Sequence, residues 1–113
     1  MSKPEQGRIV WVEIRDPQGR NLKKRPAVIV TPTADLEAAK PIVCVAITTE
    51  LPSKLTDDFV LLPYQTGGHP RTGLRKRCAA MCSWLVVVTE DEIIDYLGKA
   101  PRLPMEAILA RME

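Results

Sequence analysis

The stretch "NLKKRPAVIVTP", residues 21–32, runs three consecutive cations into a proline and then into an unbroken apolar segment. A short segment rich in Val and Ile favours a buried strand over a helix. Pro26 restricts the backbone where the charge ends and the strand begins. A solubilising loop has no need of its densest charge at such a junction, whereas a site that holds an anion against a rigid sheet edge does. The stretch therefore predicts a sheet with an anion site at one end.

Four more apolar segments are typical of strands. They read "GRIVWVEI" (7–14), "PIVCVAITT" (41–49), "DFVLLP" (58–63) and "CAAMCSWLVVV" (78–88), and the last predicts one long strand or two strands broken near Ser83. "YQTGGHPRTG" (64–73) predicts a loop because it contains paired glycines and a proline. Five or six strands followed by helices predict a mainly β (α+β) fold, a small barrel of curved antiparallel strands.

Two short helices are predicted near the C-terminus. "TEDEIIDYLGK" (89–99) has the capping-box spacing at Thr89 and Glu92, and Gly98 would end that helix. "LPMEAILARM" (103–112) places apolar residues at i, i+3, i+4 and i+7, which predicts an amphipathic C-terminal helix. The length of 113 residues fits a single domain, residues 1–113. Edge strands and an apolar helix face make a homodimer the expected assembly.

The charge is unevenly distributed along the chain. Residues 1–77 hold 13 Lys and Arg against 8 Asp and Glu, whereas residues 78–113 hold 3 against 6. The cations cluster in "RNLKKR" (20–25) and "RTGLRKR" (71–77), which indicates a polyanion partner such as nucleic acid; two solvated loops explain the charge alone equally well. No segment has the composition of a membrane span or a signal peptide, so no membrane association and a cytoplasmic location are expected.

Most enzyme classes are disfavoured by the residues present. The single histidine, His69, lies in the glycine-rich segment and is better explained as a loop residue than as a catalytic one. No phosphate-binding loop and no metal-ligand spacing occurs, so neither a cofactor nor a metal is expected. Asp57 and Asp58 are adjacent and are best explained as a turn before a strand. Three cysteines, at positions 44, 78 and 82, are expected to be reduced thiols.

Positive charge beside hydroxyl groups remains as the candidate chemistry. Arg25 stands at the start of the second predicted strand, and Thr48 and Thr49 end the third. If these strands are neighbours, a guanidinium and a hydroxyl converge and can hold a phosphodiester. RNA cleavage needs little more, because the substrate's own 2′-hydroxyl is the nucleophile. The alternative is that Arg25 caps a loop and Thr48 simply ends a strand.

Five motifs resemble the MazF/PemK toxins of type II toxin–antitoxin systems. "GRIVWVEI", "KKRPAVIVTP", "VCVAITT", "FVLLP" and "TGLRK" occur in the order and at the spacing of that family, over about residues 7–80. The resemblance implies an SH3-like barrel, a homodimer and a sequence-specific, metal-independent endoribonuclease that cleaves single-stranded RNA to a cyclic phosphate and a 5′-hydroxyl. It also implies a cognate antitoxin whose acidic C-terminal tail occupies the basic groove.

The same resemblance assigns roles to individual residues. Arg25 and Thr48 match the family's catalytic arginine and threonine, and residues 15–24 match the mobile first loop beside the RNA groove. The expected RNA-binding residues are Lys23, Lys24, Thr49, His69, Arg71, Arg75, Lys76 and Arg77. Arg77 stands where many members have an Asp that acts with an arginine in proton transfer. Because arginine is a poor proton acceptor, Arg25 is interpreted as a clamp on the transition state.

Two alternatives to RNA cleavage stay open at this stage. Related CcdB-type toxins share the barrel but inhibit DNA gyrase through the C-terminal helix, here "LPMEAILARME" (103–113). That function predicts growth arrest with intact cellular RNA. The other alternative is a degenerate relative that only binds antitoxin, which would neither cut RNA nor arrest growth.

Overall fold

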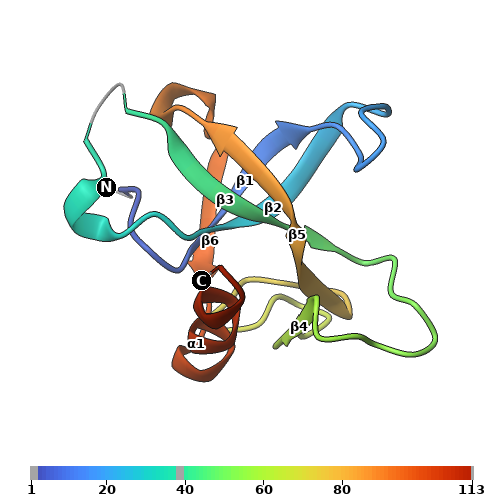
Figure 1. Ribbon diagram of the computed structural model, residues 1–113. Coiled ribbons are helices and arrows are strands. Elements are labelled where there is room, and N and C mark those ends of the chain that lie inside the picture. The colour runs from blue at the N-terminus through green and yellow to red at the C-terminus, as the bar shows by residue number, and fades with distance from the viewer. Residues whose placement is uncertain (1–2, 38–39, 113) are drawn as a thin grey trace.

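The computed structural model describes residues 3–37 and 40–112, which form one curled antiparallel sheet and a C-terminal helix (Figure 1). The strands are β1 (Arg8–Ile14), β2 (Lys23–Ile29), β3 (Ile42–Thr48), β4 (Phe59–Leu62), β5 (Cys78–Val88) and β6 (Asp95–Lys99), and the helix is α1 (Arg102–Arg111). Short 3₁₀ turns occupy Thr33–Asp35 and Glu90–Glu92. The strand order is β4-β5-β3-β2-β1-β6. This arrangement confirms the predicted mainly β fold.

The sheet carries an apolar cluster on each face. Alternate residues of β1 separate the clusters, with Ile9 in one and Val10 and Val12 in the other. The Ile9 cluster packs under α1, which contributes Met105 and the fully buried Ile108. Strands covered on both faces need apolar residues at successive positions, which is why the second half of β2 (27–29) and most of β3 (42–47) are unbroken apolar runs. The buried face of α1 confirms the predicted amphipathic C-terminal helix.

Strand β5 is continuous, but its pairing with β3 is interrupted. Ala80 pairs with Ile47, whereas Leu85 pairs with Val45, so residues 81–84 of β5 oppose only Ala46. This irregularity lies around Ser83, near which the sequence predicted either one long strand or two separate strands. The structure has one strand whose pairing register shifts there. A bulged strand bends and twists more strongly than a regular one. The bend lets β5 contribute side chains to both apolar clusters.

The helix predicted over residues 89–99 is wrong. The capping box forms, with the Thr89 N–H donating to Glu92 Oε1 over 2.8 Å, but it caps only the 3₁₀ turn. The chain then pairs with the free edge of β1, beginning with the Ile94 N–H bond of 2.8 Å to the Trp11 carbonyl. An unpaired strand edge offers backbone partners that a short isolated helix cannot replace. Tertiary pairing therefore overrides the local helix signal.

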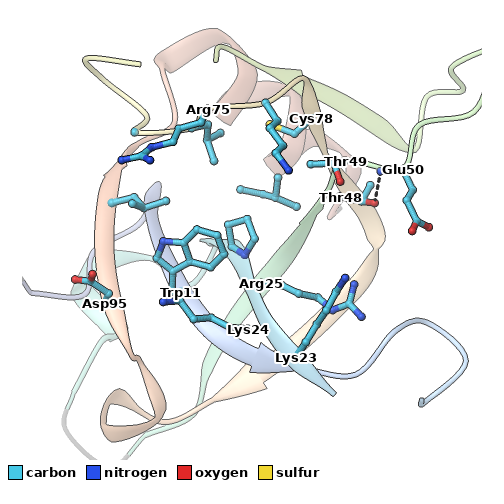
Figure 2. A pocket seen from close by; sticks show the side chains of 16 residues that line it. Trp11, Lys23, Lys24, Arg25, Thr48, Thr49, Glu50, Arg75, Cys78 and Asp95 are labelled. Carbon is cyan, nitrogen blue, oxygen red and sulfur yellow. Dashed lines mark hydrogen bonds between the residues drawn. The ribbon is translucent and has the colours of Figure 1, made fainter. Parts of the chain in front are cut away.

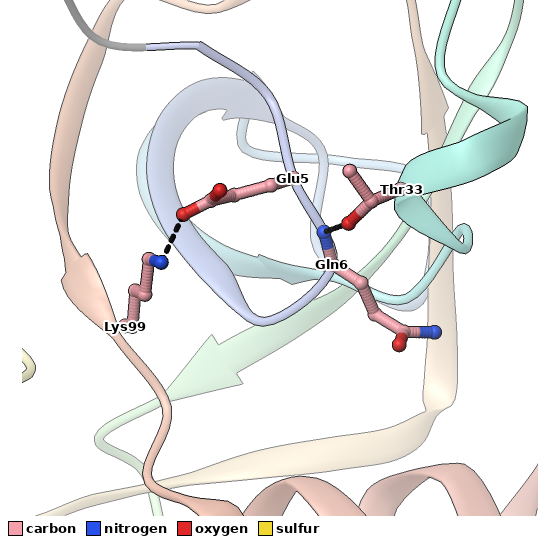
Figure 3. Close-up of polar contacts among 4 residues, drawn as sticks. All are labelled: Glu5, Gln6, Thr33 and Lys99. Carbon is pink, nitrogen blue, oxygen red and sulfur yellow. Dashed lines mark hydrogen bonds and ion pairs between the residues drawn. The ribbon is translucent and has the colours of Figure 1, made fainter.

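Contacts from the N-terminal segment hold β6 in this edge position (Figure 3). Glu5 forms an ion pair with Lys99, and the hydrogen bond from Lys99 lowers the pKa of Glu5. The Gln6 N–H donates to Thr33 Oγ1 over 2.9 Å, which ties the same segment to the turn after β2. In the described part of the chain, no helix is both long and apolar enough to cross a membrane.

We expect Gly98→Ala to destabilise the protein by about 1–3 kcal/mol, the usual cost of overpacking. Gly98 lies in β6 where the backbone at Arg71 and Thr72 crosses it, and a Cβ atom would clash with the Arg71 carbonyl. The measurement is the free energy of unfolding from urea denaturation. Gly67→Ala is the matched control, because a Cβ there meets nothing within 4 Å. Equal stability of the two variants would contradict the close crossing.

Candidate functional site

A cavity of about 590 Å³ opens at the end of the sheet where β2 and β3 meet the loop before β5 (Figure 2). Seven of the ten predicted site residues line it, namely Lys23, Lys24, Arg25, Thr48, Thr49, Arg75 and Lys76. Five of the lining side chains are cations, and the carboxylates among them are Glu50 and Asp95. This excess of positive charge in a concave surface favours an anionic ligand.

Strand pairing brings Arg25 and Thr48 to the same end of the sheet. Ala27 of β2 pairs with Ala46 of β3 at the end of the ladder, and Arg25 and Thr48 each lie two residues beyond this pair. Because side chains alternate along a strand, both residues project from the same face as that pair. Figure 2 shows both side chains on one side of the cavity. The structure therefore meets the condition set by the sequence, that the two strands are neighbours, and both residues line the same cavity.

The guanidinium of Arg25 is held by three contacts. Its Nε donates to the Ile14 carbonyl over 3.2 Å, and its Nη2 donates to the Asn21 carbonyl over 3.0 Å. Its Cζ lies 5.2 Å from the centre of the Trp84 ring, within the range of a cation–π contact. A guanidinium has five N–H groups, so these two bonds leave donors for an anion. Arg25 thus caps the first loop and is also fixed in direction at the cavity.

The side-chain hydroxyl of Thr48 is oriented by a hydrogen bond that it accepts from the backbone. Its Oγ1 accepts the Glu50 N–H over 3.0 Å, so the hydroxyl proton is available for donation. This bond also fixes the backbone of Glu50 beside the hydroxyl, as Figure 2 shows. Arg25 and Thr48 together offer a charged and a neutral donor to one ligand.

The loop before β5 supplies Arg75 and Lys76 from the other side of the cavity. Buried Thr72 anchors this loop, since its Oγ1 donates to the Pro63 carbonyl over 2.8 Å and accepts the Leu74 N–H over 3.1 Å. His69 helps to shape it, because Nδ1 accepts the backbone N–H of Arg71 over 3.1 Å.

Three predicted RNA-binding residues do not line the cavity: His69, Arg71 and Arg77. His69 is engaged in the loop's own hydrogen bonds. Arg71 and Arg77 are exposed, and both are close in sequence to Arg75 and Lys76, which line the cavity. They can contribute to the positive surface around the cavity but do not belong to its lining.

Sequence reasoning missed four side chains that line the cavity and could contact a ligand: Trp11, Glu50, Cys78 and Asp95. Glu50 follows the two threonines directly, and this proximity was a usable signal. Asp95 could not be found because residues 89–99 were expected to be helical.

Burial raises the pKa of the Cys78 thiol to about 11, so it stays protonated at neutral pH and is a poor nucleophile. Among residues 3–37 and 40–112, no group of three or more His, Cys, Asp and Glu side chains is placed to hold a metal ion.

The first loop, between β1 and β2, is organised by Asp16. Its Oδ1 accepts the Arg20 N–H over 2.8 Å, and its Oδ2 accepts the Asn21 side-chain amide over 2.7 Å. The Arg20 bond is the main reason why the pKa of Asp16 lies below its ordinary value. Because Asn21 in turn accepts from Arg25, this carboxylate indirectly helps to direct the guanidinium.

We expect Asp16 to stabilise the first loop above the pKa of an unfolded Asp and to lose this effect as the pH falls through its lower folded-state pKa. A carbon-detected NMR titration measures the pKa, and amide hydrogen exchange at Gln18 and Arg20 follows the loop. Asp16→Asn should raise exchange at both amides at neutral pH. A titration at the ordinary Asp value would contradict the assignment.

Comparisons with known proteins agree on the fold. Residues 5–113 match the family model described as PemK-like, MazF-like toxin of type II toxin-antitoxin system. No curated protein sequence matches the chain. The solved structure of MazF from Deinococcus radiodurans is similar with a TM-score of 0.73 and 17% identity, covering 99% of this chain and 94% of that one.

Two mycobacterial structures are similarly close. An endoribonuclease in complex with its cognate antitoxin, from a mycobacterial species, has a TM-score of 0.71 and 17% identity, covering 97% of this chain and 91% of that one. The Mycobacterium tuberculosis toxin MazF-mt6 has a TM-score of 0.70 and 15% identity, covering 93% and 91%. At these identities the structural likeness establishes the fold.

Proposed function

The chain belongs to the family of PemK-like, MazF-like toxins of type II toxin–antitoxin systems, and from this membership we propose that it is a sequence-specific, metal-independent endoribonuclease that cleaves single-stranded RNA. The observation that carries the proposal is that Arg25 and Thr48 both line a cavity whose lining includes five cations. RNA supplies both the anionic backbone that such a cavity favours and the 2′-hydroxyl needed for attack. The proposed place of action is the cytoplasm, where mRNA is translated.

The reaction follows from the donors that face the cavity. The 2′-oxygen forms a bond to the adjacent phosphorus, and the bond from phosphorus to the 5′-oxygen breaks, which leaves a 2′,3′-cyclic phosphate and a 5′-hydroxyl. Negative charge develops on the non-bridging oxygens during this step. Arg25 and Thr48 donate hydrogen bonds to those oxygens from fixed positions, the arrangement that lowers such a barrier most.

Proton transfer needs a group other than Arg25, because a guanidinium stays protonated. Glu50 is held beside Thr48 by its own N–H and lines the same cavity. Its carboxylate is the group we assign to accept the proton of the 2′-hydroxyl, while the 5′-oxygen is protonated from water or by the same carboxyl group. Glu50 then takes the role of the Asp for which Arg77 is substituted.

The proposed partners are a cognate antitoxin and a second copy of the chain. An acidic C-terminal tail of the antitoxin would occupy the cavity by pairing with the same cations as RNA, and one of the similar solved structures is an endoribonuclease bound to its antitoxin. For the homodimer, Leu85 and Val87 on β5 and Leu61 on β4 are large apolar side chains about half or more exposed. Apolar groups on adjacent strands are typical of a surface that is covered by a partner.

We expect Arg25→Ala to reduce cleavage of a long RNA in EDTA at least 100-fold, because a preorganised donor to the phosphate is lost. Mapping of the RNA ends gives the cut sites and the product termini. Arg20→Ala is the matched control, since Arg20 is a loop cation outside the cavity. A thermal melting curve measures how much stability is lost with the loop contacts of Arg25, so that loss of catalysis is judged on folded protein. Wild-type cleavage by folded Arg25→Ala protein would contradict the site.

We expect Thr48→Val, which keeps the shape and removes the hydroxyl, to lower the cleavage rate by about 10- to 100-fold.

We expect Glu50→Gln to lower the cleavage rate about 100-fold, because the group that accepts the proton of the 2′-hydroxyl is lost. An unchanged rate would remove Glu50 from the mechanism.

Gyrase inhibition gains no support from the helix on which it depends. Met105 and Ile108 of α1 are buried against the sheet. Growth arrest with intact cellular RNA would nevertheless favour that function. Purified protein that neither cuts RNA nor arrests growth would favour a relative that only binds antitoxin.

A further inference from the structure

The cavity has a second end, away from Thr48, that is built from three adjacent strands. Trp11 of β1 pairs with Pro26 of β2 on one side and with Asp95 of β6 on the other. Residues directly opposite each other across antiparallel strands project from the same face, so these three side chains form one row. All three line the cavity, together with Leu97 further along β6. We call Trp11, Pro26, Asp95 and Leu97 the Trp11 end.

The indole of Trp11 is an aromatic surface that a flexible cation covers. Lys24 Nζ lies 5.2 Å from the centre of the ring, and Lys24 itself lines the cavity. A cation–π contact at an exposed site contributes only about 0.5–1 kcal/mol, so the ammonium is readily displaced. Pro26 and Leu97 add apolar surface beside the ring. These features fit a flat, apolar ligand that brings its own negative charge for Lys24, which describes a nucleotide.

Asp95 adds a directional group to this apolar end. One of its oxygens, Oδ1, accepts the Tyr96 N–H over 2.8 Å, which fixes the carboxylate. In the described part of the chain no ion pair of Asp95 is found within 4.0 Å. An ionised carboxylate only accepts hydrogen bonds. A base selected by it must therefore present donors.

The Watson–Crick edges of the bases distinguish them at such a group. Guanine carries two adjacent donors there, N1–H and the N2 amino group. Adenine, cytosine and uracil each combine one donor group with acceptors, which a carboxylate repels. Bases in single-stranded RNA are read on this edge while they stack on aromatic side chains.

We propose that the Trp11 end is a subsite for a guanine base, which stacks on the indole in place of Lys24 and donates N1–H and its N2 amino group to Asp95. The inference rests on the proposed function, because it assigns part of the sequence specificity of that cleavage site. Arg25 pairs with Val12, the neighbour of Trp11, and therefore projects from the other face of the sheet, although it also lines the cavity. With the phosphate held by Arg25 and Thr48, we expect a guanosine near the cut.

The direct test is binding of ligands that cannot be cut. Fluorescein-labelled 2′-deoxyuridine pentanucleotides with central guanine, adenine, cytosine or hypoxanthine lack the attacking hydroxyl, and anisotropy at one fixed salt concentration measures their affinity. We expect the guanine ligand to bind about tenfold more tightly than the other three, hypoxanthine included because it lacks the amino group. Equal affinities for guanine and hypoxanthine would overturn the pairing with Asp95.

Variants separate the carboxylate from the ring. Asp95→Asn should remove the preference for guanine, whereas Asp35→Asn, the same charge change at an exposed residue outside the cavity, should keep it. Trp11→Leu should weaken all four ligands about tenfold, and Trp11→Phe should restore most of the affinity because it keeps an aromatic face. A preference for guanine that survives in Asp95→Asn would overturn the assignment. The comparison of guanine with hypoxanthine uses the wild-type protein, so it tests the pairing even if a variant fails to fold.

Cleavage mapping separates this inference from the proposed function. Cuts in a long RNA without a guanosine at any fixed position would overturn the subsite while the nuclease stands. A guanine preference in binding without cleavage of any RNA would support the subsite and contradict the nuclease.

Discussion

Strand β2 lies between β1 and β3, and its two ladders fix the groups around the cavity. The ladder with β3 ends at Ala27 and Ala46, two residues before Arg25 and Thr48, and the ladder with β1 places Pro26 beside Trp11. A shift of either register by one residue would turn every side chain of β2 to the other face. The apolar clusters on both faces prevent such a shift, because it would expose or overpack residues that are fully buried. The stability of the core and the geometry of the site thus depend on the same pairing.

Arg25 serves structure and ligand binding at once. Its bonds to the Ile14 and Asn21 carbonyls close the first loop, and its contact with Trp84 connects the loop to β5. These contacts hold the guanidinium in one direction before a ligand arrives. A donor that does not reorganise during the reaction is more effective than a mobile one. Lys23 and Lys24 lie beside it in the sequence but are exposed, which suits a role in attracting and exchanging ligands.

The strands were predictable because their apolar residues recur in short segments between turn residues. The sequence could predict that Arg25 and Thr48 approach each other only if β2 and β3 are neighbours, since nothing local in the sequence shows which strands pair. Residues 89–99 were misassigned because the capping box is a real local signal whose effect extends over one turn only. The edge of β1, which decides the structure of residues 95–99, is more than 80 residues earlier in the chain.

The sequence by itself determined the mainly β fold, the amphipathic C-terminal helix and the cations that make one end of the molecule positive. These properties depend on residue type and on spacing over a few positions. Only the tertiary structure decided that Asp95 lies beside Trp11, that Glu50 is fixed next to Thr48, and that His69 shapes the loop before β5 without lining the cavity. Such relations depend on the order and register of strands, which arise from burial and backbone pairing between distant segments.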